Sequence, residues 1–100
     1  MNGLTLLKCI CDETRFKILE LLQKNGEMSV NEVVSELKRD QPLVSHHLKA
    51  LKQCGIVHSR ENGKMAMYGI ANKEISRLIN DIANAGKKIA KMCEDPACCA

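Results

Sequence analysis

Six cysteines stand among the 100 residues of this chain, and half of them are gathered near its carboxyl end. Cys93, Cys98 and Cys99 place three sulfur atoms within seven residues, on either side of Pro96. Thiolates are soft ligands, which select soft ions over the harder cations that prefer oxygen. Three sulfurs without a fourth protein ligand suit the pyramidal coordination of As(III) or Sb(III), and they also suit Cd(II) or Pb(II). The spacing therefore predicts a thiolate site for a soft ion in this tail.

The remaining thiols, Cys9, Cys11 and Cys54, are possible secondary ligands. Cys9 and Cys11 would point to opposite faces of a helix, and Cys54 falls at a helix end beside the core, where a Cys commonly serves as a small hydrophobe. The chain has no Cys-x-x-Cys pair, so neither a zinc ribbon nor a thioredoxin-type motif is expected. With two Pro and six Gly it also lacks the loop-rich character of a disulfide scaffold, and we expect reduced thiols.

A second set of candidate residues lies on a predicted helix that Asp40 caps and Cys54-Gly55 ends. Val44, Leu48 and Leu51 follow helical spacing and face the core. The opposite face of this helix presents polar residues, which are Gln41, Pro42, Ser45, His46, Lys49 and Lys52. Gln and Ser side chains can read base edges, while Lys suits a phosphate or a guanine. This helix is therefore predicted to recognise DNA, although a solvated polar face is the ordinary meaning of such residues.

The distribution of charge favours DNA over a merely solvated face. Residues 36–64 hold six basic side chains against three acidic ones, so the whole formal charge of +3 falls on this segment. Arg60 and Lys64 flank the tip of a predicted hairpin, where they could reach phosphates or a minor groove. A surface salt pair is the alternative for both. His47 adjoins the inward face and is interpreted as a hydrogen-bonded structural histidine.

The elements that position these residues can be predicted from caps and periodicity. Leu4, Leu7 and Ile10 indicate a short first helix, Asp12 caps a second that Gly26 ends, and Ser29 with Glu32 forms the capping box of a third. Asn62-Gly63 between two β-prone runs predicts a hairpin. The sequence thus predicts a mainly α fold with a β-hairpin wing, that is, a winged helix-turn-helix.

A long last helix is predicted from residue 72 to 92, with an apolar stripe. Its members are Ile75, Ile79, Ile82, Gly86, Ile89 and Cys93, separated by 4, 3, 4, 3 and 4 residues. Such a stripe is typical of a helix that packs against another helix, and a small domain gains most by dimerising. We therefore expect residues 1–92 to form one DNA-binding and dimerisation domain, followed by a Cys-rich tail, 93–100. Cys93 has an alternative role as a small hydrophobe at the end of the stripe.

Composition excludes several other classes of protein. Aromatic residues make up 2% of the chain, which excludes the stacking platforms that bind single-stranded nucleic acid. No apolar run approaches the ~20 residues of a membrane span. The first residues lack the basic start and apolar stretch of a signal peptide. We expect no membrane partner and a cytoplasmic location.

Three stretches give the chain a resemblance to the ArsR/SmtB family, extending over about residues 4–92: Asp12-Glu13-Thr14-Arg15 with Ile18-Leu19, then Val44-Ser45-His46-His47-Leu48-Lys49-Ala50-Leu51, then Gly55-Ile56-Val57 with the wing. The resemblance implies a homodimeric repressor that leaves operator DNA when a metal ion or another signal binds. It also implies that the first and last helices form the dimer interface.

The family places its sensing sites at several positions, and most of the ligands of these sites are missing from this sequence. The arsenic-type Cys-Val-Cys at the start of the third helix is replaced by Met28-Ser29-Val30-Asn31-Glu32. The zinc-type site on the last helix needs His ligands, which residues 72–92 lack. Cys54 resembles a thiol that cadmium- and lead-sensing members carry, but the second helix thiol of those members corresponds to Ala50. The tail is similar to that of arsenic sensors with three cysteines near the carboxyl end.

The sequence therefore predicts a repressor, not an enzyme, that binds double-stranded operator DNA as a homodimer. The predicted inducer is As(III), Sb(III) or another soft ion bound through Cys93, Cys98 and Cys99, and no tightly bound cofactor is expected. One alternative is the same repressor switched by thiol oxidation, in which Cys93 bridges to Cys98 or Cys99, or by reactive sulfur. A less favoured alternative is an architectural DNA-binding protein that senses nothing.

Overall fold

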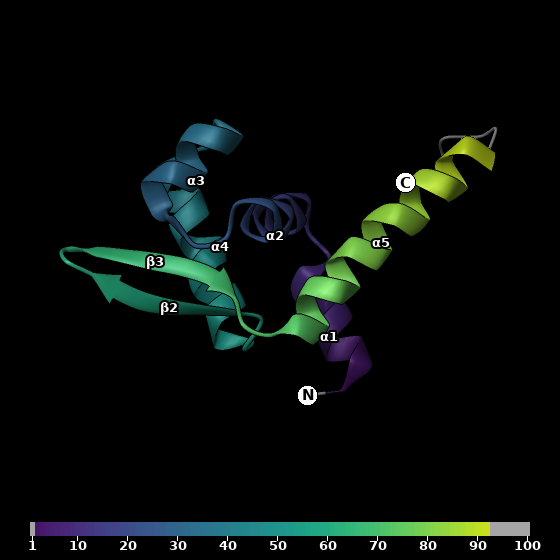
Figure 1. The fold of residues 1–100 in the computed structure, drawn as a ribbon, viewed down its shortest axis with the longest axis horizontal. Helices are drawn as coiled ribbons and strands as arrows, with labels where there is room; N and C mark the ends of the chain where they lie inside the picture. Colours follow the sequence, from purple (N-terminus) through teal and green to yellow (C-terminus); the bar gives the residue numbers. More distant parts are fainter. Residues whose placement is uncertain (1, 93–100) are drawn as a thin grey trace.

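The structure is a computed structural model, which describes the backbone of residues 2–92 and the side chains of residues 2–89. Five helices and three strands follow in the order α1 (Gly3–Ile10), α2 (Glu13–Asn25), β1 (Met28–Ser29), α3 (Val30–Leu37), α4 (Gln41–Gln53), β2 (Val57–Asn62), β3 (Met65–Ile70) and α5 (Lys73–Met92). Figure 1 shows the β2–β3 hairpin projecting to one side of the helices and α5 leaving on the other. The predicted mainly α fold with a hairpin wing is confirmed.

The helix ends lie where the capping residues predict them. The Asp12 carboxylate accepts a hydrogen bond from the Arg15 amide at 3.0 Å, and Gly26 ends α2 with a φ of 78° that favours glycine. Ser29 and Glu32 form the predicted capping box, in which each side chain accepts from the other residue's amide, at 3.2 and 3.1 Å. Asp40 occupies the N-cap position of α4, but its side chain makes no capping hydrogen bond.

The wing is an antiparallel hairpin that a third, short strand widens into a sheet. β2 pairs with β3 from Val57↔Ile70 to Asn62↔Met65, so the strands continue up to the predicted turn. β1 pairs with the other edge of β3, and the sheet order is β1-β3-β2. β1 was not predicted, because two residues are too few to show the alternation of a strand. Its pairing fixes the base of the wing to the start of α3.

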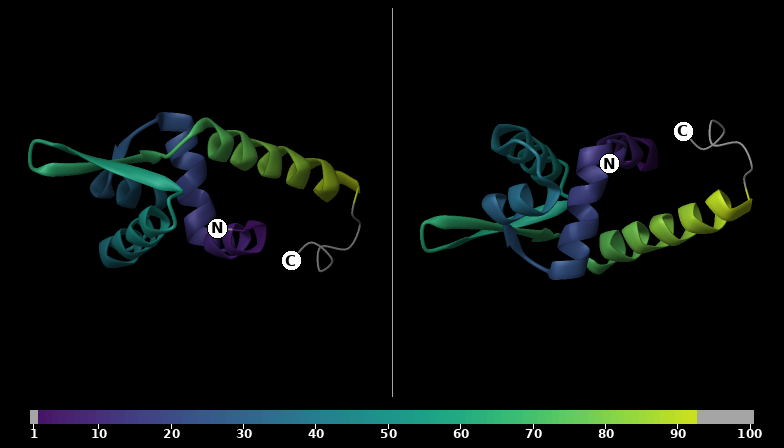
Figure 2. Two further views of the ribbon diagram at one scale, coloured as in Figure 1. Left: turned by 90° about the horizontal axis from the view of Figure 1, so that it is seen from below. Right: turned by 90° about the horizontal axis from the view of Figure 1, so that it is seen from above.

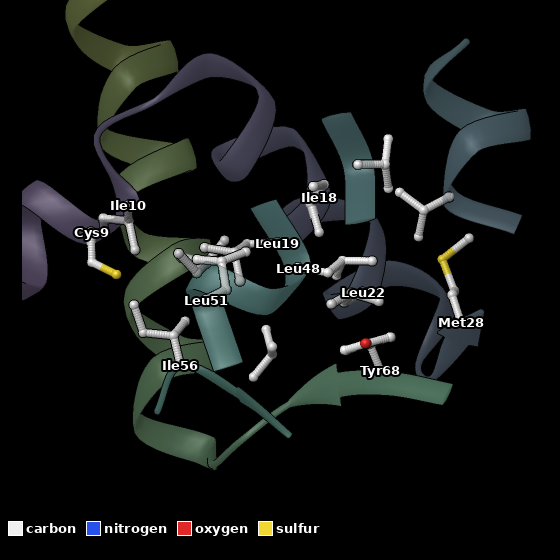
Figure 3. Packing of buried hydrophobic residues seen from close by; sticks show 14 residues of the cluster. Cys9, Ile10, Ile18, Leu19, Leu22, Met28, Leu48, Leu51, Ile56 and Tyr68 are labelled. Carbon is white, nitrogen blue, oxygen red and sulfur yellow. The ribbon is translucent and has the colours of Figure 1, made fainter. Parts of the chain in front are cut away.

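An aliphatic core joins α2, α3 and α4 to the sheet. Figure 3 shows Leu19, Leu48 and Leu51 packed together between the helices, with Tyr68 from β3 beneath Leu22. Val44, Leu48 and Leu51 are fully buried, as the spacing in α4 predicts. Cys9 and Ile10 bring the end of α1 to the same core. α4 is therefore held along its inner side.

One part of the apolar stripe of α5 packs against the core of the same chain, and another part is exposed. Ile79 is buried, and Ile75 and Ile82 pack partly against the core of the same chain, whereas Ile89 remains 58% exposed. The sequence interpretation gave the whole stripe to a partner helix. The structure corrects it, because the first turns of α5 cover the chain's own α2 and β3. Figure 2 shows the later turns of α5 extending away from the rest of the molecule. No helix among the described residues is long and apolar enough to cross a membrane.

Candidate nucleic-acid interface

The outer face of α4 carries all six of the helix residues predicted to contact DNA. Because three inward residues anchor the helix, the residues on the opposite side of α4 point away from the core. Gln41, Pro42, His46, Lys49 and Lys52 are exposed, and Ser45 is half-buried. An α-helix with one polar face free is the element that fits the major groove of B-DNA. The geometry of α4 thus suits base and phosphate contacts along one side.

The tip of the wing lies near the start of α4. Gln41 at the beginning of the helix and Lys64 in the hairpin turn both line one shallow hollow of about 180 Å³, together with the first residues of α3. A molecule that occupies this side of the protein therefore meets the helix and the wing at once.

Ion pairs distinguish the basic residues of this surface. The Arg60 Nε donates to the Glu27 carboxylate at 2.7 Å, and an Arg39 Nη2 lies 3.7 Å from a carboxylate oxygen of Glu13. Among the side chains that the structure describes, Lys49, Lys52 and Lys64 have no acidic partner. These lysines are therefore available for phosphates, whereas Arg60 is already engaged at the base of the wing.

His47 connects α4 to the start of α2. The Arg15 Nε donates to His47 Nδ1 at 3.0 Å, and the imidazole is only 12% exposed. Burial lowers the pKa of His47 below its ordinary value, and the carboxylate of Asp12 opposes this effect. The hydrogen bond from the Arg15 amide lowers the pKa of Asp12. His47 is thus the hydrogen-bonded structural histidine that the sequence predicted.

A contact at the base of the wing was missed by the sequence. A Cβ on Gly69 would lie 3.0 Å from His58 Nε2 and 3.1 Å from Glu27 Cγ, so only glycine leaves room for these side chains without displacement. His58 Nδ1 lies 3.9 Å from the same Glu27 carboxylate that Arg60 contacts. His58, Arg60 and Gly69 are each more than 30 positions from Glu27 in the sequence, so no local pattern connects them to Glu27. Together they set the wing against the α2–β1 connection.

Two of the cysteines are bonded to each other, whereas reduced thiols were expected. Cys9 in α1 and Cys54 at the C-cap of α4 form a disulfide across 45 residues, while Cys11 is exposed and outside it. The expectation of reduced thiols is therefore wrong for this pair, because the tertiary fold brings the end of α1 to the end of α4. The prediction that Cys9 and Cys11 point to opposite faces of one helix does not apply, because Cys11 is the C-cap that follows α1; Cys9 is buried and Cys11 is exposed.

The predicted soft-ion residues Cys93, Cys98 and Cys99 lie outside the described residues. Within residues 2–92, no group of three or more His, Cys, Asp or Glu side chains is placed to hold a metal ion.

Sequence comparison matches residues 12–59 to the family described as "Bacterial regulatory protein, arsR family". An uncharacterised HTH-type transcriptional regulator of Methanocaldococcus jannaschii is 42% identical over 80 residues, which are 77% of this chain and 90% of that protein. A cadmium resistance regulatory protein CadC homologue of Staphylococcus aureus is 32% identical over 79% of this chain and 65% of its own length. The arsenical resistance operon repressor of Escherichia coli is 36% identical over 66% of this chain and 56% of its length. This chain thus spans less than two thirds of these two metal-resistance regulators.

Two solved structures are similar to this chain in both fold and sequence. HlyU of Vibrio cholerae superposes with a TM-score of 0.76 at 31% identity, covering 83% of this chain and 89% of that one. The homodimeric winged helix-turn-helix DNA-binding domain of a possible ArsR-family regulator from Mycobacterium bovis gives 0.75 at 28% identity, covering 81% and 74%.

Proposed function

Because this chain belongs to the ArsR family of winged helix-turn-helix transcriptional regulators, we propose that it is a homodimeric repressor that leaves its operator when a thiophilic ion binds its cysteines. Its relatives are DNA-binding regulators, and the chain is not an enzyme. Residues 1–92 form the DNA-binding and dimerisation domain in this proposal, and residues 93–100 carry the inducer site. A cytoplasmic location follows from the need to reach DNA.

The DNA-binding part of the proposal rests on one observation, the free outer face of α4 beside the tip of the wing. Lys49, Lys52 and Lys64 supply unpaired positive charge there, which phosphates attract. Gln41 and Ser45 have the donor and acceptor groups that base edges require. Pro42 contributes to the shape of this face, and His46 contributes an imidazole ring that can form hydrogen bonds. Arg60 joins this set through its place on the wing, although Glu27 holds it at 2.7 Å.

The homodimer is supported by apolar surface that the chain itself does not cover. Leu4 and Leu7 of α1 are 62% and 54% exposed, and Ile89 of α5 is 58% exposed. Apolar side chains of this size on two helices are typical of an interface. A solved neighbour with 28% identity is described as homodimeric. A second copy of this chain accounts for these faces, and two recognition helices then read two half-sites.

The inducer site is proposed from the chemistry of its donors. Cys93, Cys98 and Cys99 supply three soft sulfur ligands within seven residues. Two relatives are named for cadmium and arsenical resistance. The tail follows directly after α5, so an ion bound there would restrain the end of the proposed dimer helix. That restraint would alter the spacing of the two α4 helices.

The test is fluorescence anisotropy of a DNA fragment from the region upstream of the protein's own gene. Reduced protein is bound to the fragment and then titrated with arsenite. We expect stoichiometric release, with an operator affinity lower by about 5- to 150-fold, the usual coupling between two linked sites. A double variant, Cys98→Ser with Cys99→Ser, is expected to bind the operator as before and to ignore arsenite. Cys11→Ser serves as the matched control and is expected to respond like the natural protein.

The other outcomes separate the alternatives. Release by an oxidant but not by arsenite would replace the metalloid proposal with thiol oxidation in the tail. Equal affinity for unrelated DNA of the same length would favour an architectural protein. Loss of operator binding in the double variant would contradict the assignment of the tail to sensing alone.

A further inference from the structure

We propose that Cys9 and Cys54 are a reversible redox pair, whose oxidation ties α1 to the end of the recognition helix and strengthens operator binding. This inference rests on DNA binding by α4 and is independent of the inducer site in the tail. It differs from the oxidation alternative for Cys93, Cys98 and Cys99 in the cysteines involved and in the direction of the effect.

The position of the two sulfurs carries the inference. Cys9 lies in the last turn of α1 and is buried, and Cys54 is the C-cap of α4 and is half-buried. Their Cα atoms are 6.9 Å apart, near the upper end of the span that a disulfide bridges. The partners are 45 residues apart in sequence, so only the folded chain brings them together. A bond between them joins two elements that otherwise touch over a small area.

The tie acts at the junction that sets the direction of α4. Arg15 donates to His47 in the middle of α4 at 3.0 Å and to the carbonyl of Cys9 at 3.1 Å. The middle of the helix is thus held to α2, and the disulfide holds its carboxyl end to α1. With both attachments in place, α4 cannot tilt relative to α1. Lys49 and Lys52 project from this last part of the helix.

Restricting the tilt of α4 matters for binding, because a rigid recognition element loses less conformational freedom when it docks on DNA. The fold that contains the disulfide presents the outer face of α4 freely, so the tied form can dock on DNA without rearrangement of this helix. Reduction leaves two separate thiols, and the end of α4 then depends on packing alone. We therefore expect the reduced form to bind the operator more weakly.

A hydroperoxide supplies the oxidising equivalents. Cys54 is the more accessible sulfur and reacts first: its thiolate attacks a peroxide oxygen of H₂O₂, the O–O bond breaks, and a sulfenic acid and water form. Cys9 then attacks the Cys54 sulfur, the S–S bond forms, and a second water leaves. In total, two thiols and H₂O₂ give one disulfide and two waters. A dithiol reductant reverses the reaction by thiol–disulfide exchange.

The Cys9–Cys54 bond can be mapped in the whole chain, because the tail cysteines fall in a separate tryptic peptide. Reduced protein is treated with H₂O₂, the peroxide is removed with catalase, and remaining thiols are alkylated before digestion with trypsin. Cleavage after Lys and Arg places Cys9 and Cys11 in the peptide 9–15, Cys54 in 53–60 and the tail cysteines in 92–100. We expect peptides 9–15 and 53–60 to be joined, with Cys11 alkylated. Cys11→Ser should keep the joined product, and Cys54→Ser should lose it.

The same samples are then assayed for operator binding. Oxidised protein is expected to bind at least about fivefold more tightly than reduced protein, the low end of coupling between linked sites. Cys9→Ser and Cys54→Ser should show no difference between the two treatments, and Cys11→Ser should retain it. Absence of the joined peptides, an unchanged affinity, or weaker binding of the oxidised protein would overturn the inference.

A triple variant with Cys93, Cys98 and Cys99 changed to Ser separates this inference from the proposed function. It should ignore arsenite yet keep the redox difference. Suppose that arsenite releases the natural protein from the operator, but that oxidised and reduced protein bind the operator equally. The proposed function would then stand, and the redox role of Cys9 and Cys54 would be contradicted.

Discussion

His47 shows how a single side chain can belong to α4 without lying on its free outer face. Its Nδ1 accepts the Arg15 hydrogen bond at 3.0 Å, which requires that nitrogen to be unprotonated. Protonation would remove the acceptor and place a second cation beside the guanidinium. Burial already opposes that charge and lowers the pKa of His47. The neutral ring is therefore part of what holds α4 to α2.

A pH dependence of stability follows from this residue. Since the pKa of His47 is lower in the folded protein than its ordinary value of 6.5, the unfolded chain binds the proton first as the pH falls. Stability from this group is complete well above pH 6.5 and declines below it. We expect urea unfolding at pH 7.5 and 5.5 to show a loss of about 1 kcal/mol from this hydrogen bond. His47→Gln should lose that part of the pH dependence.

The matched control for this measurement is His46→Gln. His46 is the neighbouring histidine and is exposed, with its ring centroid 5.5 Å from that of His47. Its variant should keep most of the pH dependence of the natural protein, because burial is the largest cause of the lowered pKa of His47 and the charge of His46 is the smallest. If the natural protein and the His47→Gln variant lost the same amount of stability between pH 7.5 and 5.5, the role of His47 would be contradicted. Asp12, whose pKa is also lowered, contributes only in a more acidic range, because its ordinary value is 3.8.

At the scale of elements, α4 and the wing form one surface because three separate contacts fix them. Buried aliphatic residues hold the inner side of α4, β1 pairs with β3 at the base of the wing, and Glu27 engages Arg60 on β2. Each contact joins segments that are distant in sequence. The result is a helix and a hairpin that meet at one hollow, which Gln41 of α4 and Lys64 of the wing both line.

Removing one of these lysines gives a test of phosphate contact. Lys49→Ala is expected to weaken operator binding several-fold and about equally for different DNA sequences, because a phosphate contact carries no sequence information. The slope of log K against log salt should become less steep by about one for each Lys49 that meets a phosphate. Both quantities can be measured by anisotropy at several salt concentrations.

Lys24→Ala is the control for this prediction. Lys24 is exposed in the last turn of α2 and borders a hollow beside α5, away from the outer face of α4. Its removal changes the net charge by the same amount. If both variants changed the salt slope equally, net charge rather than contact would explain the effect.

At the scale of the whole molecule, the proposed dimer faces and the proposed DNA face lie on different elements. Figure 2 shows α1 and α5 near opposite ends of α2, both on the side away from the hairpin, with the later turns of α5 directed away from the hairpin. The exposed leucines of α1 and Ile89 of α5 leave apolar surface that this chain alone does not bury. In the proposed dimer, a signal acting on α1 or on the end of α5 would therefore change the distance between the two α4 helices without touching their outer faces.

The proposed dimer can be broken by one charge. Leu7→Glu places a carboxylate in the apolar face of α1, where an unpaired buried charge is strongly unfavourable. We expect the dimer Kd to rise at least about tenfold, which corresponds to ~1.4 kcal/mol. Analytical ultracentrifugation measures this change, and circular dichroism confirms that the variant is folded. Met65→Glu, an equally exposed apolar site at the tip of the wing, should leave the dimer intact.

A monomeric natural protein at micromolar concentration would contradict this proposal directly. So would a Leu7→Glu variant that sediments as the natural protein does.

The sequence by itself determined the local elements of this protein. Asp12, Gly26 and the Ser29–Glu32 pair act on amides within a few residues, so the ends of α2 and α3 could be read from the order of residues alone. The same holds for the inward residues of α4 and for the hairpin at Gly63, since helical period and turn chemistry are local properties. The predicted outer face of α4 followed from these positions.

Only the tertiary structure decided which distant residues meet. The Cys9–Cys54 bond, the Glu27–Arg60 pair and the approach of Glu27 to Gly69 all join segments more than 30 residues apart. No period or cap encodes such pairs, because they depend on how whole helices and strands pack. The division of the α5 stripe has the same origin: a repeat shows that a face is apolar, whereas packing decides whether the chain itself covers it.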